Sequence, residues 1–505
     1  MSVYKPMLSK SLRDNLNELR KLLHNPDDLQ VKFIKAGGTD DPCLVLYMDG
    51  LADDRLIQED IIHLLQTMKE ERGKGDREAA IGKLLDDMEA RVLPVGIARR
   101  TTLWQDLIPA VLSGDTVLLI EGCEQGVVVK SRKWPERAIE EPQTEALVRG
   151  PRIGFTESIF RNLALLRRQI RDKELVFETQ SIGRRSNQVL AICYIQDIVN
   201  LNIVEEVKRR LASVDIESAP ESGTVEQWIE DSFLSPFPQL LHTERPDKVV
   251  SSMLQGKVAI LVDGSPFALI LPTTFVSLIQ SPEDYNERWL IGSLIRLLRV
   301  IAIFITLFLP AVYIALVSFH QGLIPFTLVF SVAAAREGVP FPAFVEAVLM
   351  EGTLELLREA GLRMPKPMGQ TISIVGGLVI GETAIQAGLV SPVMLIVVAV
   401  TAVASFAIPS YSAGITFRIL RFCTMIASAI FGFFGIILVA IMIVIHLLRL
   451  ESFGVPYTAP IAPQLGSDWR DLFIRAPLTM LKNRPHFMQP RNAQRASEAG
   501  KRKSP

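Results

Sequence analysis

One acidic residue, Glu382, lies in a stretch that is otherwise uncharged, residues 371–386. An ionised carboxylate inside a membrane is costly unless it faces water or a partner group. If the stretch is a helix, Glu382 shares one stripe with four other residues: Thr371, Val375, Val379 and Gln386. Such a stripe is typical of a helix that lines an aqueous path or a subunit interface. We therefore predict that these five residues line a pore.

A different role for Glu382 follows from the same pattern. A protonated or hydrogen-bonded Glu382 would hold two helices together and line nothing. Another face of the same helix carries three glycines, at which a second helix could approach closely. These predicted helix-packing positions are Gly376, Gly377 and Gly381.

Residues suited to enzyme chemistry do not form a site in the sequence. The six histidines are far apart, and none begins a metal-binding or triad spacing. Glu346 and Glu355 resemble a catalytic carboxylate pair, but with Glu351 and Glu359 they mark the polar side of an amphipathic helix, residues 341–360. We expect that side to be solvated or to line a vestibule. The sequence therefore predicts no catalytic residue, no metal site, no cofactor and no enzyme.

The region that positions Glu382 is a block of apolar segments between residues 297 and 448. Residues 299–319 and 423–448 are long enough to span a bilayer, and residues 393–408 form a shorter span. Two further apolar runs are shorter or are interrupted by small and polar residues: 323–335 and 371–390. We expect about four to five membrane segments. If one run does not cross, the basic C-terminal tail lies on the same side as the N-terminal region, which we prefer.

Composition limits the kind of partner and the cellular compartment that we expect for the protein. The net charge of −1 over 505 residues gives no general attraction to nucleic acid. The four cysteines show no CxxC or metal-binding spacing, which is typical of a reducing compartment. Residues 1–30 contain no apolar signal-peptide core, so we expect the N-terminal region to be cytoplasmic.

The N-terminal region contains an internal similarity. Residues 47–59 can be aligned with residues 194–206, and residues 114–122 with residues 256–264. Each half then has a strand, a helix and a later hairpin with an acid–glycine turn, which indicates two related α/β subdomains. A chance likeness of strand–helix units is the alternative. We expect a helical linker around residues 144–171.

The expected architecture is α+β with a membrane part: two related cytoplasmic α/β subdomains followed by an α-helical transmembrane domain. The predicted boundaries are 1–140 for the first subdomain, 141–280 for the linker helix and second subdomain, 281–450 for the transmembrane domain with an interfacial amphipathic helix, and 451–505 for a cytoplasmic tail. We expect the basic end of the tail, residues 482–505, to be disordered.

Basic residues between and within the two halves suggest an anion site or a contact with an acidic partner. The alternative is that they are only solvated or paired with acids, and none has the spacing of a phosphate loop. The candidates are Arg149, Arg152, Arg167, Arg168, Arg184 and Arg185.

Several loop motifs closely resemble the A subunit of the GerA family of spore germinant receptors. They include VRGPRIGFTES (148–158), SPFPQ (235–239), TERPDKV (243–249), VAILVDGSPFALILPT (258–273), SPEDYNERWL (281–290) and SFGVPY (452–457). The resemblance implies a multi-pass protein of the inner membrane of the endospore. It also implies a transporter-like B subunit and a lipoprotein C subunit as partners, and homo-oligomers that conduct monovalent cations across the lipid.

The resemblance and the residue pattern meet at Glu382. If several copies of residues 371–386 surround an axis, Val375 and Val379 would form a hydrophobic gate and Glu382 an acidic ring that favours cations. The alternatives are an amplifying channel of the related SpoVAF type, a non-conducting membrane scaffold for the receptor complex, and a secondary transporter. A transporter is disfavoured because the chain has too few spans for an inverted repeat.

Overall fold

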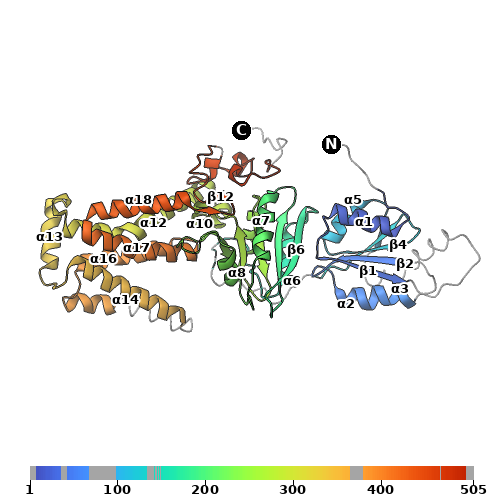
Figure 1. The fold of residues 1–505 in the computed structure, drawn as a ribbon, viewed down its shortest axis with the longest axis horizontal. Coiled ribbons are helices and arrows are strands. Elements are labelled where there is room, and N and C mark those ends of the chain that lie inside the picture. The colour runs from blue at the N-terminus through green and yellow to red at the C-terminus, as the bar shows by residue number, and fades with distance from the viewer. Residues whose placement is uncertain are drawn as a thin grey trace, which may run out of the picture. The chain divides into compact units, whose positions relative to one another are not determined.

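The computed structural model describes residues 7–35, 42–67, 98–133, 142, 145, 147, 149–363, 379–466 and 468–495. Contacts divide the chain into two compact units. Unit 1 contains Met1–Asp231, Leu240–Pro272 and Lys482–Pro505; unit 2 contains Ser232–Gln239 and Thr273–Leu481. The strands of the two large sheets belong to unit 1, and the long helices belong to unit 2 (Figure 1).

The first subdomain of unit 1 is an antiparallel five-stranded sheet between two helical layers. Its strands lie in the order β1 (Leu29–Lys35), β2 (Pro42–Met48), β4 (Thr116–Ile120), β5 (Gly126–Val129) and β3 (Ala98–Thr101). Helices α1 (Leu12–Leu22) and α5 (Trp104–Leu112) cover one face, and α2 (Asp54–Leu56), the π-helix Ile57–Ile62 and α3 (His63–Thr67) cover the other (Figure 1). Residues 43–48 of β2 are therefore buried on both faces.

The second subdomain has the same topology. Its strands lie in the order β6 (Leu175–Ile182), β7 (Gln188–Ile195), β9 (Val258–Val262), β10 (Ala268–Leu271) and β8 (Leu241–Thr243). Its helices are α6 (Ile159–Gln169), α7 (Leu201–Ala212), α8 (Ser222–Ile229) and α9 (Pro246–Met253). Because each strand has a counterpart at the same place in the other sheet, the predicted repeat is confirmed.

Local contacts repeat as well as topology. Before α1, Ser9 N donates to Asn15 Oδ1 (2.8 Å) and Asn15 Nδ2 donates to Ser9 O (2.6 Å). Before α6, Thr156 and Asn162 form the same two bonds at 2.8 and 2.6 Å. In each case an acid in the turn after a central strand, Glu121 or Asp263, accepts a bond from the first backbone N–H of the helix. Helix α6 is therefore the counterpart of α1.

This equivalence corrects one expectation. The helix predicted around residues 144–171 as a linker is α6, which packs as the first element of the second subdomain. The sequence comparison began at the second strand of each half, so it missed the shared first helix.

The repeat supplies a matched pair for a stability test. Gly114 and Gly256 hold corresponding positions with φ of 91° and 94°, a conformation that favours glycine. A Cβ on Gly114 would lie 2.6 Å from Leu51 O, whereas on Gly256 its nearest neighbour would be 3.6 Å away. We expect Gly256→Ala to lower the free energy of unfolding by about 1–2 kcal/mol through backbone strain, and Gly114→Ala to lower it further. Denaturant midpoints of the full chain measure both; equal losses would contradict the steric explanation.

Unit 2 is built around a helical bundle. Its helices include α10 (Phe275–Ile279), α11 (Glu283–Asn286), α12 (Trp289–Ser318), α13 (Phe326–Arg336), α14 (Ala343–Arg363), α16 (Pro392–Phe406), α17 (Tyr411–Phe431) and α18 (Phe433–Arg449). Among the described residues, α12 and α17 are long and apolar enough to cross a membrane, and α13, α16 and α18 are shorter apolar helices. Helix α12 runs through Pro310 without interruption, so residues 289–298 and the first predicted span form one continuous helix.

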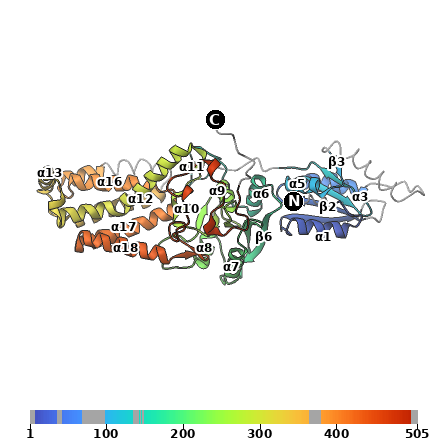
Figure 2. The ribbon, with the colours of Figure 1, turned by 90° about the horizontal axis from the view of Figure 1, so that it is seen from above.

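The expected single span at residues 423–448 is wrong. Gly432, with φ of 61°, ends α17 and begins α18. The two helices lie side by side (Figure 1, Figure 2). A Cβ on Gly435 would lie 2.1 Å from Ala427 O, so only glycine permits the two helices to approach this closely. The long apolar run is therefore a helical hairpin.

The chain that leaves α18 returns to the segment before α12. The hairpin of β11 (Glu451–Ser452) and β12 (Val455–Pro456) follows α18 directly. Within it, Ser452 Oγ accepts a hydrogen bond from Thr273 N (3.0 Å). Further along, Arg296 of α12 contacts Asp471 Oδ1 at 3.0 Å. The start of α12 and the end of α18 therefore lie at the same end of the bundle.

The C-terminal tail does not follow the predicted boundary. Residues 482–495 belong to unit 1, where Arg484 Nε donates to Leu254 O and Arg491 N donates to Ile198 O, both at 2.9 Å. The expectation of disorder is wrong for these residues, because they are held by hydrogen bonds from a side chain and from the backbone. Residues 496–505 lie outside the described residues.

Candidate functional site

Five charged side chains meet between α14 and α17. We call them the buried charge cluster: Glu351, Glu355, Arg358, Arg418 and Arg421. Arg421 pairs with Glu351 at 2.9 Å, and both side chains are only 1 % exposed. Glu355 pairs with Arg418 at 2.7 Å, with Arg421 at 3.2 Å and with Arg358 at 3.3 Å. Glu355 also borders an open groove of about 300 Å³.

The position of Arg421 makes this cluster energetically sensitive. Arg421 lies midway along α17, one of the two helices suited to cross a membrane. Removing two charges from water costs free energy that only close pairing recovers. The two fully buried charges, Glu351 on α14 and Arg421 on α17, therefore depend on each other.

A second buried acid connects three further elements. Glu346 of α14 is fully buried, pairs with Arg336 at 2.9 Å and accepts a hydrogen bond from Ser391 N at 2.9 Å. The Ser391 hydroxyl in turn accepts a bond from Met394 N and caps α16. Glu346 thus fixes the ends of α13 and α16 against α14.

These two sites correct the expectation for two of the four acids in residues 341–360, whereas Glu355 borders a groove and Glu359 is exposed. We expected the acids of that helix to face water or a vestibule, but Glu346 and Glu351 are buried against arginines. Helical spacing reveals a polar stripe but not what covers it. The partner of Glu351 lies on a helix far along the chain, so no local spacing could identify it.

The predicted pore stripe is described only in part. Val379 is 49 % exposed, and Glu382 and Gln386 are also exposed on the single chain. Gln386 Nε2 donates to Glu382 Oε1 at 3.2 Å. Thr371 and Val375 lie outside the described residues, as do Gly376 and Gly377. Gly381 is buried and faces the Leu395 side chain of α16, where a Cβ would lie 3.1 Å away.

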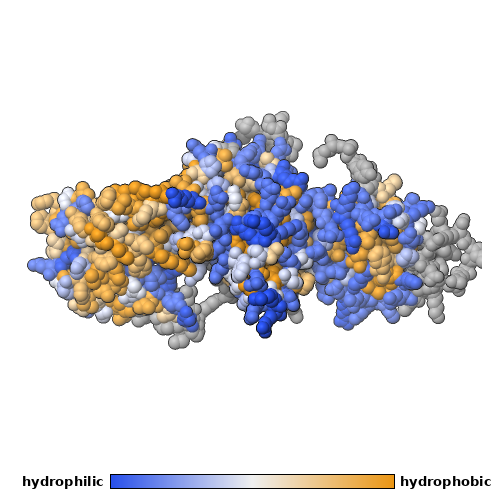
Figure 3. All heavy atoms as spheres, viewed as in Figure 1, coloured by the Kyte–Doolittle hydropathy of each residue, from blue (hydrophilic) through white to orange (hydrophobic). Residues whose placement is uncertain are grey.

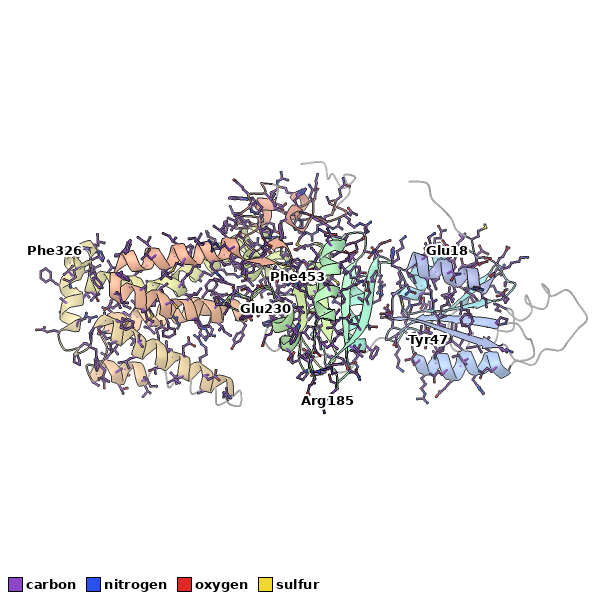
Figure 4. All side chains as sticks on the ribbon, viewed as in Figure 1. Glu18, Tyr47, Arg185, Glu230, Phe326 and Phe453 are labelled. Carbon is purple, nitrogen blue, oxygen red and sulfur yellow. The ribbon has the colours of Figure 1, made fainter. Side chains whose placement is uncertain are left out.

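Apolar side chains cover much of the outer surface of the bundle. Figure 3 shows an orange surface over its helices. Helix α13 contains no buried residue, and Phe326 at its start points away from the bundle (Figure 4). This surface is what lipid or another copy of the chain would cover.

The six candidate arginines divide into two groups. Arg167 is buried, where it pairs with both carboxylate oxygens of Asp28 at 2.9 Å and stacks on Phe177. It is therefore not available to an external partner. Arg184 and Arg185 are exposed and pair with Asp215 and Glu217 at 3.0 and 3.6 Å. Arg149, Arg152 and Arg168 are exposed and also make contacts.

One contact resembles part of a hydrolase site. Ser235 Oγ lies 2.8 Å from His446 Nε2. No hydrogen bond or ion pair joins a carboxylate to His446 among the described residues, and its ring stacks on Phe237. Within the same residues, no group of three histidine, cysteine or acidic side chains could hold a metal ion. The serine–histidine contact therefore serves to hold a loop, as described below.

Comparisons with known proteins find similarity to spore germination proteins along almost the whole chain. A family model described as Bacillus/Clostridium GerA spore germination protein matches residues 17–487. Spore germination protein GerLA of Bacillus cereus is 48 % identical over 96 % of this chain and 97 % of its own length. Spore germination protein B1 of Bacillus subtilis (strain 168) is 44 % identical over 95 % and 97 %. A crystal structure of the N-terminal domain of the A subunit of the Bacillus megaterium spore germinant receptor GerK3 is 32 % identical, covers 54 % of this chain and 98 % of that chain, and has a TM-score of 0.43.

Proposed function

Because the chain belongs to the GerA family of spore germination proteins, we propose that it is the A subunit of a nutrient germinant receptor that forms a germinant-gated cation channel. The observation that carries the proposal is the match to spore germination proteins over nearly the full length of both chains. The channel works in the inner membrane of the endospore. Its partners are a transporter-like B subunit and a lipoprotein C subunit.

The membrane part of the proposal rests on the dimensions and surface of unit 2. The 30 residues of α12 give a length of about 45 Å, more than the roughly 30 Å of a hydrocarbon core. Apolar side chains are exposed along α12, α16, α17 and α18, as expected of helices that face lipid. Because α12 starts where α18 ends, the two α/β subdomains and the tail are on one side, which we assign to the cytoplasm.

The conducting path requires more than one copy of the chain. In a single copy, Val379, Glu382 and Gln386 have exposed side chains. In a closed ring of copies, these side chains would face the axis. Val379 would then narrow the path by excluding water, and the Glu382 carboxylates would favour monovalent cations over anions.

Disulfide cross-linking tests this assembly. We expect Val379→Cys, in a chain with Cys123 and Cys423 replaced by serine, to form disulfide-linked dimers on oxidation in native membranes, because residues around a narrow axis come close enough to bridge. Ile430→Cys is the matched control, since Ile430 is similarly exposed but lies on α17. Denaturing gels without reductant measure the product. Dimers at position 430 but not at 379 would contradict the proposed axis.

A further inference from the structure

Residues 232–239 form a closed loop that we call the clamped loop. It follows α8 and precedes β8, yet its contacts place it in unit 2. Ser232 N donates to Gln239 Oε1 at 2.8 Å, and Gln239 Nε2 donates back to Ser232 O at 2.7 Å. Gln239 is fully buried, so the two ends of the loop are fixed to each other.

Both helices of the hairpin hold the clamped loop. Ser235 Oγ bonds to His446 in the last turns of α18, and the Thr416 hydroxyl of α17 donates to Pro236 O. Phe237 is buried, with its ring 6.1 Å from the Phe417 ring and 6.0 Å from the His446 ring. Thr416 is near the start of α17 and His446 near the end of α18. The loop is therefore fixed about one turn inside that end of the bundle.

The tip of this rigid loop is apolar and uncovered. Phe233 is 82 % exposed and Leu234 is 81 % exposed, the largest fractions among the large apolar side chains of the described residues. The bonds between Ser232 and Gln239 and the buried Phe237 ring fix the loop on both sides of the tip. Two adjacent apolar side chains held outward in this way are suited to enter an apolar phase.

Exposed apolar side chains on the neighbouring helices indicate that this apolar phase is a lipid bilayer. At the same end of the bundle, Tyr411 of α17 and Ile445 and Leu448 of α18 are also exposed. The tip therefore lies at the same end of the bundle as exposed apolar side chains of helices that we place in a membrane, and the inference rests on that part of the proposed function. We propose that Phe233 and Leu234 insert into the lipid bilayer, so that the clamped loop is an anchor at the membrane surface.

A spin label at the tip tests the proposal in the full-length protein. The background carries Cys123→Ser and Cys423→Ser, since Cys43 and Cys193 are buried. Leu234→Cys is labelled with a nitroxide in phosphatidylcholine–phosphatidylglycerol vesicles, and collisions with oxygen and with a water-soluble nickel chelate are compared. Arg185→Cys reports water, because Arg185 is exposed at the surface of unit 1 (Figure 4). Ile430→Cys reports lipid.

The expected result is an oxygen-to-nickel collision ratio at position 234 several-fold above that at position 185 and close to that at 430. A ratio equal to that at 185 would mean that the tip lies in water, and would overturn the proposal. Exclusion of both reagents would also overturn it, since a second copy or another protein would then cover the tip. If position 430 reports water as well, the membrane placement of α17 fails and the inference fails with it.

Discussion

Replacing Arg421 with alanine is expected to destabilise the bundle by about 3–5 kcal/mol. The substitution leaves the carboxylate of Glu351, whose side chain is 1 % exposed, without the guanidinium 2.9 Å away. It also removes one of the cations that face Glu355. An uncompensated charge in a buried site must either lose its charge or open the structure to water, and both weaken the contact between α14 and α17.

The measurement is the thermal unfolding midpoint of the full-length protein in detergent. Arg363→Ala is the matched control, because Arg363 pairs with Glu359 on the exposed surface of the same α14 and such pairs contribute about 0–1 kcal/mol. The double substitution Arg421→Met with Glu351→Leu should recover much of the stability, since neither charge then remains buried. Equal midpoints for Arg421→Ala and Arg363→Ala would show that the pair is not buried in the native protein.

The second large effect is on function. Deleting the chain is expected to abolish cation release in response to the nutrient that its receptor recognises, and Glu382→Gln is expected to reduce the rate. The amide keeps the size of the side chain and its ability to bond Gln386, but removes the negative charge that would concentrate cations in the path. Glu359→Gln removes an acid from the exposed surface of α14 and should leave the rate unchanged.

The α/β part of the fold was predictable because the repeat is carried by local residues. Gly114 and Gly256, and likewise Gly122 and Gly264, have positive φ at corresponding turns. Turns of this kind demand glycine, so the sequence retains their spacing. The contact between Arg167 and Asp28 was not predictable, because it joins residues far apart in sequence and a basic helix face does not identify its acid.

The apolar segments of the membrane part were predictable from hydropathy, but the pairing of its charges and the positions of its turns were not. Two glycines within the long apolar run, Gly432 and Gly435, were the available indication of a hairpin. A count of apolar residues does not register such glycines, so it predicts one continuous span. Glu382 was identified because it has no neighbouring charge. The acid partners of Arg421 come from α14, far away in the sequence, so no local pattern identifies them. An isolated charge can be recognised from the neighbouring sequence, but the partner of a paired charge can be identified only once the fold is known.

The most direct test of the central claim is the release of monovalent cations from spores of the natural host after nutrients are added. Spores carrying the wild-type chain, the deletion, Glu382→Gln and Glu359→Gln are compared at equal protein abundance. A nutrient-gated channel predicts no triggered release for the deletion, slower release for Glu382→Gln and normal release for Glu359→Gln. Release that is triggered but slowed by the deletion would instead favour an amplifying channel. Normal release without the chain would contradict the proposed function, and normal release with Glu382→Gln would remove Glu382 from the conducting path.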